Sequence, residues 1–193
     1  MKTSYFPTPP GEYPNIFEAS KNIAFAMGST LVMGSLLKTL VASKPGGRFL
    51  EIGTGTGLAT CWLVDGMDHN SQLISLDNDP KVLAIAQKTF QKDSRVKFHC
   101  IDATQWLPNY KKAPFDLIFA DAWPGKFSHI DQTLALLKTG GIYIIDDLLP
   151  QDNWPEGHQK KVHDLIKTLL TKKDFTHTQM DWATGVMILV RRR

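Results

Sequence analysis

Three aspartates follow two apolar runs and have the residue type and spacing of a cation site. Asp121 comes directly after the run 115–120, and Asp146 and Asp147 come directly after the run 142–145. Because neighbouring strands lie about 4.8 Å apart, these carboxylates should emerge side by side. They would repel one another unless a cation or protons intervene. Carboxylate oxygens suit Mg²⁺ or Ca²⁺, so the sequence predicts a divalent metal site formed by Asp121, Asp146 and Asp147.

A glycine-rich turn follows another predicted strand. Its glycines let the backbone turn tightly and approach a ligand closely, with a helix N-terminus behind them. The spacing is GxGxG, whereas the fingerprint of a dinucleotide site is GxGxxG. A purely structural turn is the alternative. The predicted ligand-binding residues here are Glu51, Gly53, Thr54, Gly55, Thr56 and Gly57.

Polar residues also end the next two predicted strands. Asp77, followed by Asn78, is placed where a carboxylate can accept both hydroxyls of a ribose. Asp102 and Ala103 are placed on the rim where an adenine would lie. With Glu51, these acceptors favour a ligand that has an adenosine and a cationic end. Helix capping is the alternative for both aspartates, although Asp79 is the better cap beside Asp77.

Alternating strand and helix patterns position these residues. Strands are predicted at 48–52, 73–77, 96–101, 115–120, 142–145, 175–181 and 186–190, with helices from about Leu58, from Pro80 and over 160–170. Several strands are apolar throughout, as strands covered on both faces require. The pattern predicts an α/β fold: a Rossmann-like, doubly wound, seven-stranded, mostly parallel sheet between two helical layers. The short connection 182–185 predicts that the last strand runs antiparallel.

Length and composition indicate one globular domain over residues 1–193. Hydrophobic residues make up 42% and charged residues 21% of the 193 residues, and neither a repeat nor a linker divides the chain. The first fifteen residues are rich in proline, so residues 1–20 are predicted to be an N-terminal arm or lid. The longest apolar stretch, 23–42, is interrupted by glycines and a lysine, which indicates a packed helix and no membrane partner.

Charge and cysteine content indicate the compartment and exclude some partners. Lys and Arg total 22 against 19 Asp and Glu, and three of the cations form the tail 191–193. The remaining chain is neutral, which argues against a nucleic-acid partner. Cys61 and Cys100 are too few for a disulfide framework or a zinc site and are expected to be buried. With no signal-peptide pattern at the start, a cytoplasmic location is predicted.

Taken together, these motifs resemble the class I S-adenosylmethionine-dependent methyltransferases. The segment 51–57 looks like their first motif, and Asp77 and Asp102 fall where that family binds ribose and adenine. The resemblance covers residues 20–193 and is closest to the small-molecule O-methyltransferases of the catechol and caffeoyl-CoA type. In those enzymes the residues matching Asp121 and 146–147 bind a metal. The segment matching 26–29 lies over the methionine part of the cofactor, which adds Met27 and Ser29 to the predicted site.

The resemblance implies an S-adenosylmethionine-dependent O-methyltransferase (EC 2.1.1.-) that acts on a hydroxyl of a small molecule. A divalent metal, Mg²⁺ or Ca²⁺, is a candidate cofactor that would assist the reaction. Two departures stand out. The group usually has Asn where this chain has Asp147, and its catalytic Lys follows the first Asp by three residues, whereas Lys126 follows Asp121 by five. Asp121 and Lys126 are the predicted catalytic residues. His129 and His158 are alternative bases, and a solvated loop lysine is the alternative for Lys126.

Aromatic residues are candidate walls of the site. Trp123 could stack on the adenine or, with Trp154, line the acceptor pocket, whereas Trp106 is expected in the core. Four aromatics of the N-terminal segment could fold over the cleft or simply dock on the fold. These are Tyr5, Phe6, Tyr13 and Phe17.

Other functions remain open at this point. A nicotinamide-dependent oxidoreductase is disfavoured by the GxGxG spacing and the lack of a Tyr-x-x-x-Lys pair. A methyltransferase acting on a protein or RNA amine lacks a supporting feature. An inactive interaction module does not explain carboxylates at four strand ends. Either a monomer or a homodimer is compatible with the sequence.

Overall fold

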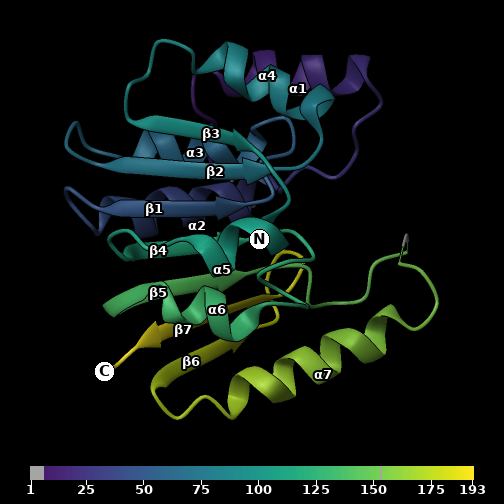
Figure 1. The fold of residues 1–193 in the computed structure, drawn as a ribbon. Helices are drawn as coiled ribbons and strands as arrows, with labels where there is room; N and C mark the ends of the chain where they lie inside the picture. The colour runs from purple at the N-terminus through teal and green to yellow at the C-terminus, as the bar shows by residue number, and fades with distance from the viewer. Residues whose placement is uncertain (1–6, 153) are drawn as a thin grey trace, which may run out of the picture.

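A single seven-stranded sheet organises the chain in a computed structural model that describes residues 7–152 and 154–193 (Figure 1). The strands are β1 (Arg48–Ile52), β2 (Gln72–Asp77), β3 (Val96–Cys100), β4 (Phe115–Ala120), β5 (Leu137–Ile145), β6 (Phe175–Met180) and β7 (Val186–Arg191). Their order is β3-β2-β1-β4-β5-β7-β6. The first five strands pair in parallel, whereas β7 pairs antiparallel with both β5 and β6. The predicted mostly parallel sheet with an antiparallel last strand is confirmed.

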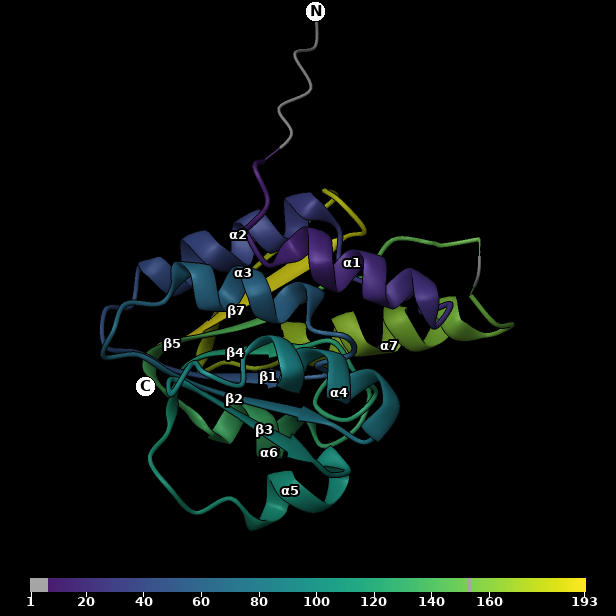
Figure 2. The same cartoon turned by 90° about the horizontal axis from the view of Figure 1, so that it is seen from above.

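Helices form a layer on each face of the sheet. They are α1 (Tyr13–Asn22), α2 (Leu31–Ala42), α3 (Leu58–Gly66), α4 (Pro80–Thr89), α5 (Ala103–Asn109), α6 (Ile130–Ala135) and α7 (His158–Leu170). Helices α1, α2 and α3 share one apolar cluster with the sheet, and α5, α6 and α7 share the other; the two layers are visible in Figure 2. None of the helices in the described part of the chain is long and apolar enough to span a membrane.

The alternation of side chains along each strand divides the core into these two clusters. In β4, Leu117 and Phe119 face the layer of α1 to α3, whereas Ile118 and Ala120 face the layer of α5 to α7. All four side chains are fully buried. Because successive side chains point to opposite faces, a strand covered on both faces must be apolar at every position. The central apolar runs of the sequence are explained in this way.

The N-terminal segment differs from the extended arm that the prolines indicated. Residues 13–15 open α1, in which Ile16 and Ser20 are buried. Proline is compatible with the first turn of a helix, because the N–H that it lacks has no helical partner there. Tyr5 and Phe6 lie outside the described residues. The expected helix over 23–42 is also shorter than predicted. Helix α2 begins at Leu31, and residues 23–30 are not helical.

Two further details correct the sequence interpretation. Strand β5 begins at Leu137 and not at 142, with a register shift against β4 that accommodates the glycine pair 140–141. Cys61 is buried as expected, but Cys100 is exposed. Cys100 ends β3, and β3 is an edge strand whose residues are only partly covered.

Candidate functional site

A cavity of about 840 Å³ opens at the carboxyl ends of β1, β2, β4 and β5. Open α/β sheets bind their ligands at this edge, and the volume lies in the range of about 300–1,000 Å³ that is typical of ligand sites. Most of the predicted binding residues line it: Met27, Ser29, Gly53, Thr54, Gly55, Thr56, Asp77, Asn78, Asp102, Ala103, Asp121 and Trp123. Lys126, Asp146 and Asp147 line it as well.

The glycine-rich turn is fixed from two sides. Gly53 has a φ of 100°, and a Cβ at this position would lie 2.6 Å from the carbonyl oxygen of Asp121, so only glycine lets the turn press against the end of β4. The Oδ2 atom of Asp77 accepts a hydrogen bond of 2.7 Å from the N–H of Gly55. Asp79, as expected, caps α4 by accepting from the N–H of Lys81. Asp77 therefore does not cap α4, and it lines the cavity.

Glu51 lies behind this turn and does not line the cavity. Its carboxylate is fully buried and accepts hydrogen bonds from the hydroxyls of Thr60 and Ser75. The other oxygen, Oε1, has no partner among the described residues. Burial raises the pKa of Glu51 to about 7, although the two hydrogen bonds oppose the shift. Gly57 also lies off the cavity, at the start of α3, so both residues support the turn from outside the cavity.

Asp102 both caps a helix and lines the cavity. Its carboxylate caps α5 by accepting a hydrogen bond of 2.8 Å from the N–H of Thr104, which holds its pKa below the usual range. The same residue lines the cavity beside Ala103. Capping thus fixes the aspartate at the rim and does not remove it from the site.

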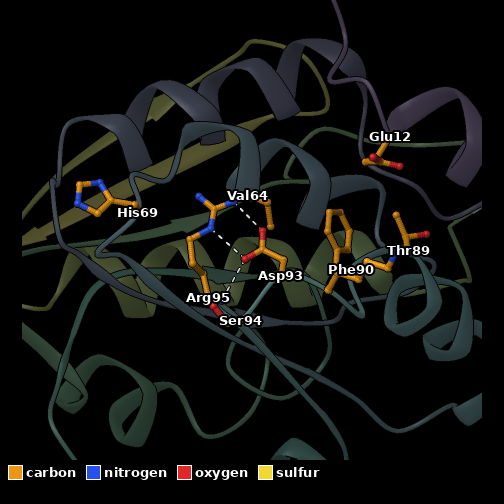
Figure 3. Close-up of a pocket in the computed structure, with 9 residues that line it drawn as sticks. Glu12, Val64, His69, Thr89, Phe90, Asp93, Ser94 and Arg95 are labelled. Carbon is orange, nitrogen blue, oxygen red and sulfur yellow. Dashed lines mark hydrogen bonds and ion pairs between the residues drawn. The ribbon is translucent and has the colours of Figure 1, made fainter.

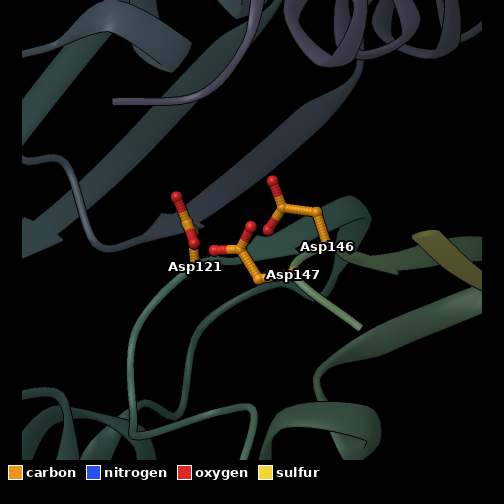
Figure 4. Close-up of side chains that lie close together, drawn as sticks. All are labelled: Asp121, Asp146 and Asp147. Carbon is orange, nitrogen blue, oxygen red and sulfur yellow. The ribbon is translucent and has the colours of Figure 1, made fainter. Parts of the chain in front are cut away.

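The three aspartates predicted to bind a metal come together. One carboxylate oxygen from each of Asp121, Asp146 and Asp147 lies within 4.8 Å of the others, and Figure 4 shows the side chains converging. Asp146 is 3% exposed, and its Oδ1 has no hydrogen-bond partner among the described residues. Burial and the neighbouring Asp146 raise the pKa of Asp121 well above its usual range, and burial raises that of Asp146 to about 6. The close placement of these carboxylates therefore favours a bound proton or a bound cation.

Lys126 reaches this cluster despite its displaced position in the sequence. The loop after β4 turns at Gly125, whose carbonyl accepts a hydrogen bond of 2.6 Å from the hydroxyl of Tyr143. The turn carries Lys126 back over the sheet edge, where its Nζ lies 3.9 Å from Oδ1 of Asp146. The side chain is buried, so the interpretation as a solvated loop lysine is wrong.

Aromatic rings surround the outer part of the cavity. The ring centroid of Trp123 lies 4.8 Å from that of Phe127, and His158 lies 4.6 Å from Trp154. All four residues line the cavity. Burial, with Lys126 and Lys161 nearby, lowers the pKa of His158.

Two further candidates, the alternative base His129 and the aromatic Trp106, lie away from the cavity. His129 does not line the cavity and lies at the start of α6, which leaves His158 as the histidine near the site. Trp106 stacks on Tyr110 with 4.5 Å between ring centroids and packs against the core, as expected.

Sequence reasoning missed several residues that line the cavity, among them Phe25 and Thr184. Phe25 packs on Gly55, where an added Cβ would lie 2.9 Å from its ring. Thr184 lines the cavity and accepts a hydrogen bond from the N–H of Asp147. The signal for Thr184 was present, because a hairpin that ends in an antiparallel strand beside β5 places its turn at the carboxyl edge of the sheet. For Phe25 no pattern indicated the contact.

A second hollow of about 690 Å³ lies away from these residues, near the start of β3 (Figure 3). Its central cation, Arg95, is already bound by the carboxylate of Asp93 and by the carbonyl of Met67. None of the predicted site residues lines it. Most of the predicted site residues thus line the first cavity and not this hollow.

Comparison with known proteins gives a consistent result. The model of a family described as a methyltransferase domain matches residues 50–148, about half of the chain. A Mycobacterium tuberculosis protein named a probable O-methyltransferase is 30% identical over 121 residues, which cover 60% of this chain and 54% of the relative. The match thus spans about half the length of that relative.

Solved structures resemble nearly the whole chain. The O-methyltransferase TomG from Streptomyces achromogenes, in complex with SAM, has a TM-score of 0.84 at 20% identity, with 99% of this chain and 94% of TomG covered. An O-methyltransferase from Bacillus cereus in complex with SAH has a TM-score of 0.80 at 22% identity, with 97% of this chain and 94% of that chain covered. At these identities the similarity establishes the fold.

Proposed function

Since this chain belongs to the methyltransferase-domain family, we propose that it is an S-adenosylmethionine-dependent O-methyltransferase that methylates a hydroxyl of a small molecule. The observation that carries this proposal is one cavity that joins the glycine-rich turn to the acidic cluster. The turn has the residues for an adenosine, and the cluster has the residues for an acceptor oxygen. Both lie at the edge where such sheets bind ligands.

The cofactor is assigned to the inner part of the cavity. Asp77 would accept hydrogen bonds from the ribose hydroxyls, and Asp102 and Ala103 would border the adenine. The hydroxyl oxygen of Ser29 is buried at the cavity without a partner among the described residues, so it is available to the methionine end. The two structural neighbours hold SAM and SAH, which supports the same cofactor here.

The acidic cluster fits a divalent cation. Its three carboxylates form a set of hard oxygen ligands, which suits Mg²⁺ or Ca²⁺, and one of these oxygens, Oδ1 of Asp146, has no hydrogen-bond partner among the described residues. A cation bound there would lower the pKa of an acceptor hydroxyl and orient its oxygen. We assign Asp121, Asp146 and Asp147 to hold it.

Lys126 and the aromatic rim act on the acceptor. Lys126 is buried beside Asp146, and we assign its Nζ, as the neutral amine, to take the proton of the acceptor hydroxyl, with His158 as the second candidate. Trp123 and Trp154 would hold a flat acceptor. Because methyl transfer needs an in-line approach, most of the acceleration would come from this positioning, and no covalent bond to the protein is required.

Other parts of the proposal rest on the sequence alone. We propose that residues 1–193 act as one methyltransferase domain in the cytoplasm, as a monomer or homodimer. Neither a nucleic acid nor a membrane is proposed as a partner, because the chain is neutral apart from the cations at 191–193.

The test is methyl transfer from isotopically labelled S-adenosylmethionine to a panel of catechols, simple phenols, aliphatic alcohols and amines. The panel is run with Mg²⁺ and again after chelation. We expect label on the oxygen of a hydroxylated acceptor. Label on amines alone would instead support a methyltransferase of another class.

A further inference from the structure

Asp147 has a backbone conformation that a residue with a side chain seldom adopts. Its φ is 53°, in the left-handed region. The carboxylate also lies close to those of Asp121 and Asp146, which repel it. Because strain and repulsion both act against this placement, other contacts must hold Asp147 at the cluster.

The turn between β6 and β7 supplies these contacts. The N–H of Asp147 donates a hydrogen bond of 3.2 Å to Oγ1 of Thr184. The next two N–H groups, of Leu148 and Leu149, donate to the carbonyls of Gly185 and Thr184 at 3.2 and 2.8 Å. A Cβ at Gly185 would lie 2.5 Å from the N atom of Leu149, so the two segments touch. Three successive N–H groups after β5 thus donate hydrogen bonds to one turn.

Only one of these three contacts depends on a side chain. We propose that Thr184 is a positioning residue, whose hydroxyl holds Asp147 so that its carboxylate completes the cation site. Thr184 does not act on the reacting atoms. This inference rests on the cation part of the proposed function.

Cation affinity measures this role directly. Calorimetric titration with Mn²⁺ and with Mg²⁺ compares the wild type with Thr184→Val, which removes the hydroxyl and keeps the shape, and with Thr184→Ser, which keeps the hydroxyl. We expect Thr184→Val to weaken cation binding about five-fold, as the loss of one hydrogen bond would, and Thr184→Ser to stay within about two-fold. In an Asp147→Ala background, Thr184→Val should have no further effect.

Controls separate positioning from a general loss of structure. Thr178→Val makes the same chemical change at an exposed position of β6 and should leave cation affinity unchanged. S-adenosylhomocysteine affinity should be unchanged in all the single variants. If Thr184→Val does not fold, Thr184→Ala replaces it.

The outcomes are distinct. If the wild type binds a cation and Thr184→Val binds it equally well, this inference alone is overturned. Equal losses in Thr184→Val and Thr184→Ser also overturn it, because the hydroxyl would then not matter. A wild type that binds no cation overturns both this inference and the cation part of the proposed function.

Discussion

At the scale of single residues, the acidic side chains of the site differ in what they contact. Asp77 and Asp102 accept hydrogen bonds from backbone N–H groups, whereas Asp121 and Asp146 lie against each other. The hydrogen bonds of the Glu51 carboxylate to described residues come from hydroxyls. The sequence could predict the aspartates because they directly follow apolar strands. It could not predict that Glu51 is buried, since the Thr60 hydroxyl comes from the following helix.

Asp77→Asn should weaken binding of S-adenosylhomocysteine about 10- to 100-fold, because a charged acceptor of hydrogen bonds is lost at the turn. Calorimetric titration measures the effect. Asp68→Asn is the matched control, because Asp68 also accepts from a glycine N–H, that of Gly46, but does not line the cavity. Equal affinities of the two variants would contradict the role of Asp77.

Lys126→Met should lower kcat/KM about 100-fold or more, because the group assigned to the acceptor proton is removed. S-adenosylhomocysteine affinity should stay within about two-fold of the wild type. Lys160→Met is the control, since Lys160 is an exposed lysine paired with Asp164. A Lys126→Met variant with full activity would transfer the role to His158.

Glu51 should make the protein less stable as the pH rises. Its pKa is about 7 in the folded protein and near the ordinary value of 4.5 when unfolded, so the folded state binds more protons between these values. The free energy of unfolding should therefore fall by roughly 3 kcal/mol between pH 4.5 and 7 from this group.

Glu51→Gln removes this contribution, and denaturant unfolding at pH 5, 6, 7 and 8 measures it. The difference in stability between variant and wild type should shift in favour of the variant across this range. Asp146 contributes in the same direction, but it is present in both proteins and cancels in the difference. A difference that does not vary with pH would contradict the raised pKa of Glu51.

At the scale of elements, periodicity predicted the strands well because each central strand is covered on both faces. It failed where local geometry decided the outcome. The glycine pair 140–141 was read as a turn before β5, but a shift in register lets the strand continue through it. Residues 7–12 are not helical, but Pro14, which was also read as part of an extended arm, lies in the first turn of α1, where proline is tolerated.

The contact between the turn after β1 and the end of β4 gives a prediction at this scale. Gly53→Ala should lower the free energy of unfolding by about 2 kcal/mol or more, because alanine disfavours a φ of 100° and its Cβ would meet the carbonyl of Asp121. Denaturant unfolding measures the change. Gly11→Ala is the control, since an added Cβ there has no atom within 4 Å. Equal stability of the two variants would show that the turn tolerates a side chain.

At the scale of the whole molecule, the order of the strands brings the site together. β1, β2, β4 and β5 end at one edge, and the turn of the antiparallel hairpin meets them there. Ligands of such sheets bind at the carboxyl ends of the strands, so the sequence could predict that the residues following the strands meet at one edge. It could not predict the paths of the loops. The burial of Lys126 depends on one turn at Gly125 that Tyr143 fixes.

The most direct test of the account is calorimetric titration of the wild-type protein with S-adenosylhomocysteine and, separately, with NADH. Both ligands contain an adenosine, but only the first has the amino-acid end that Ser29 is assigned to receive. We expect micromolar binding of S-adenosylhomocysteine and no heat with NADH. Binding of NADH without binding of S-adenosylhomocysteine would contradict the assignment of the cofactor, and with it the proposed methyl transfer.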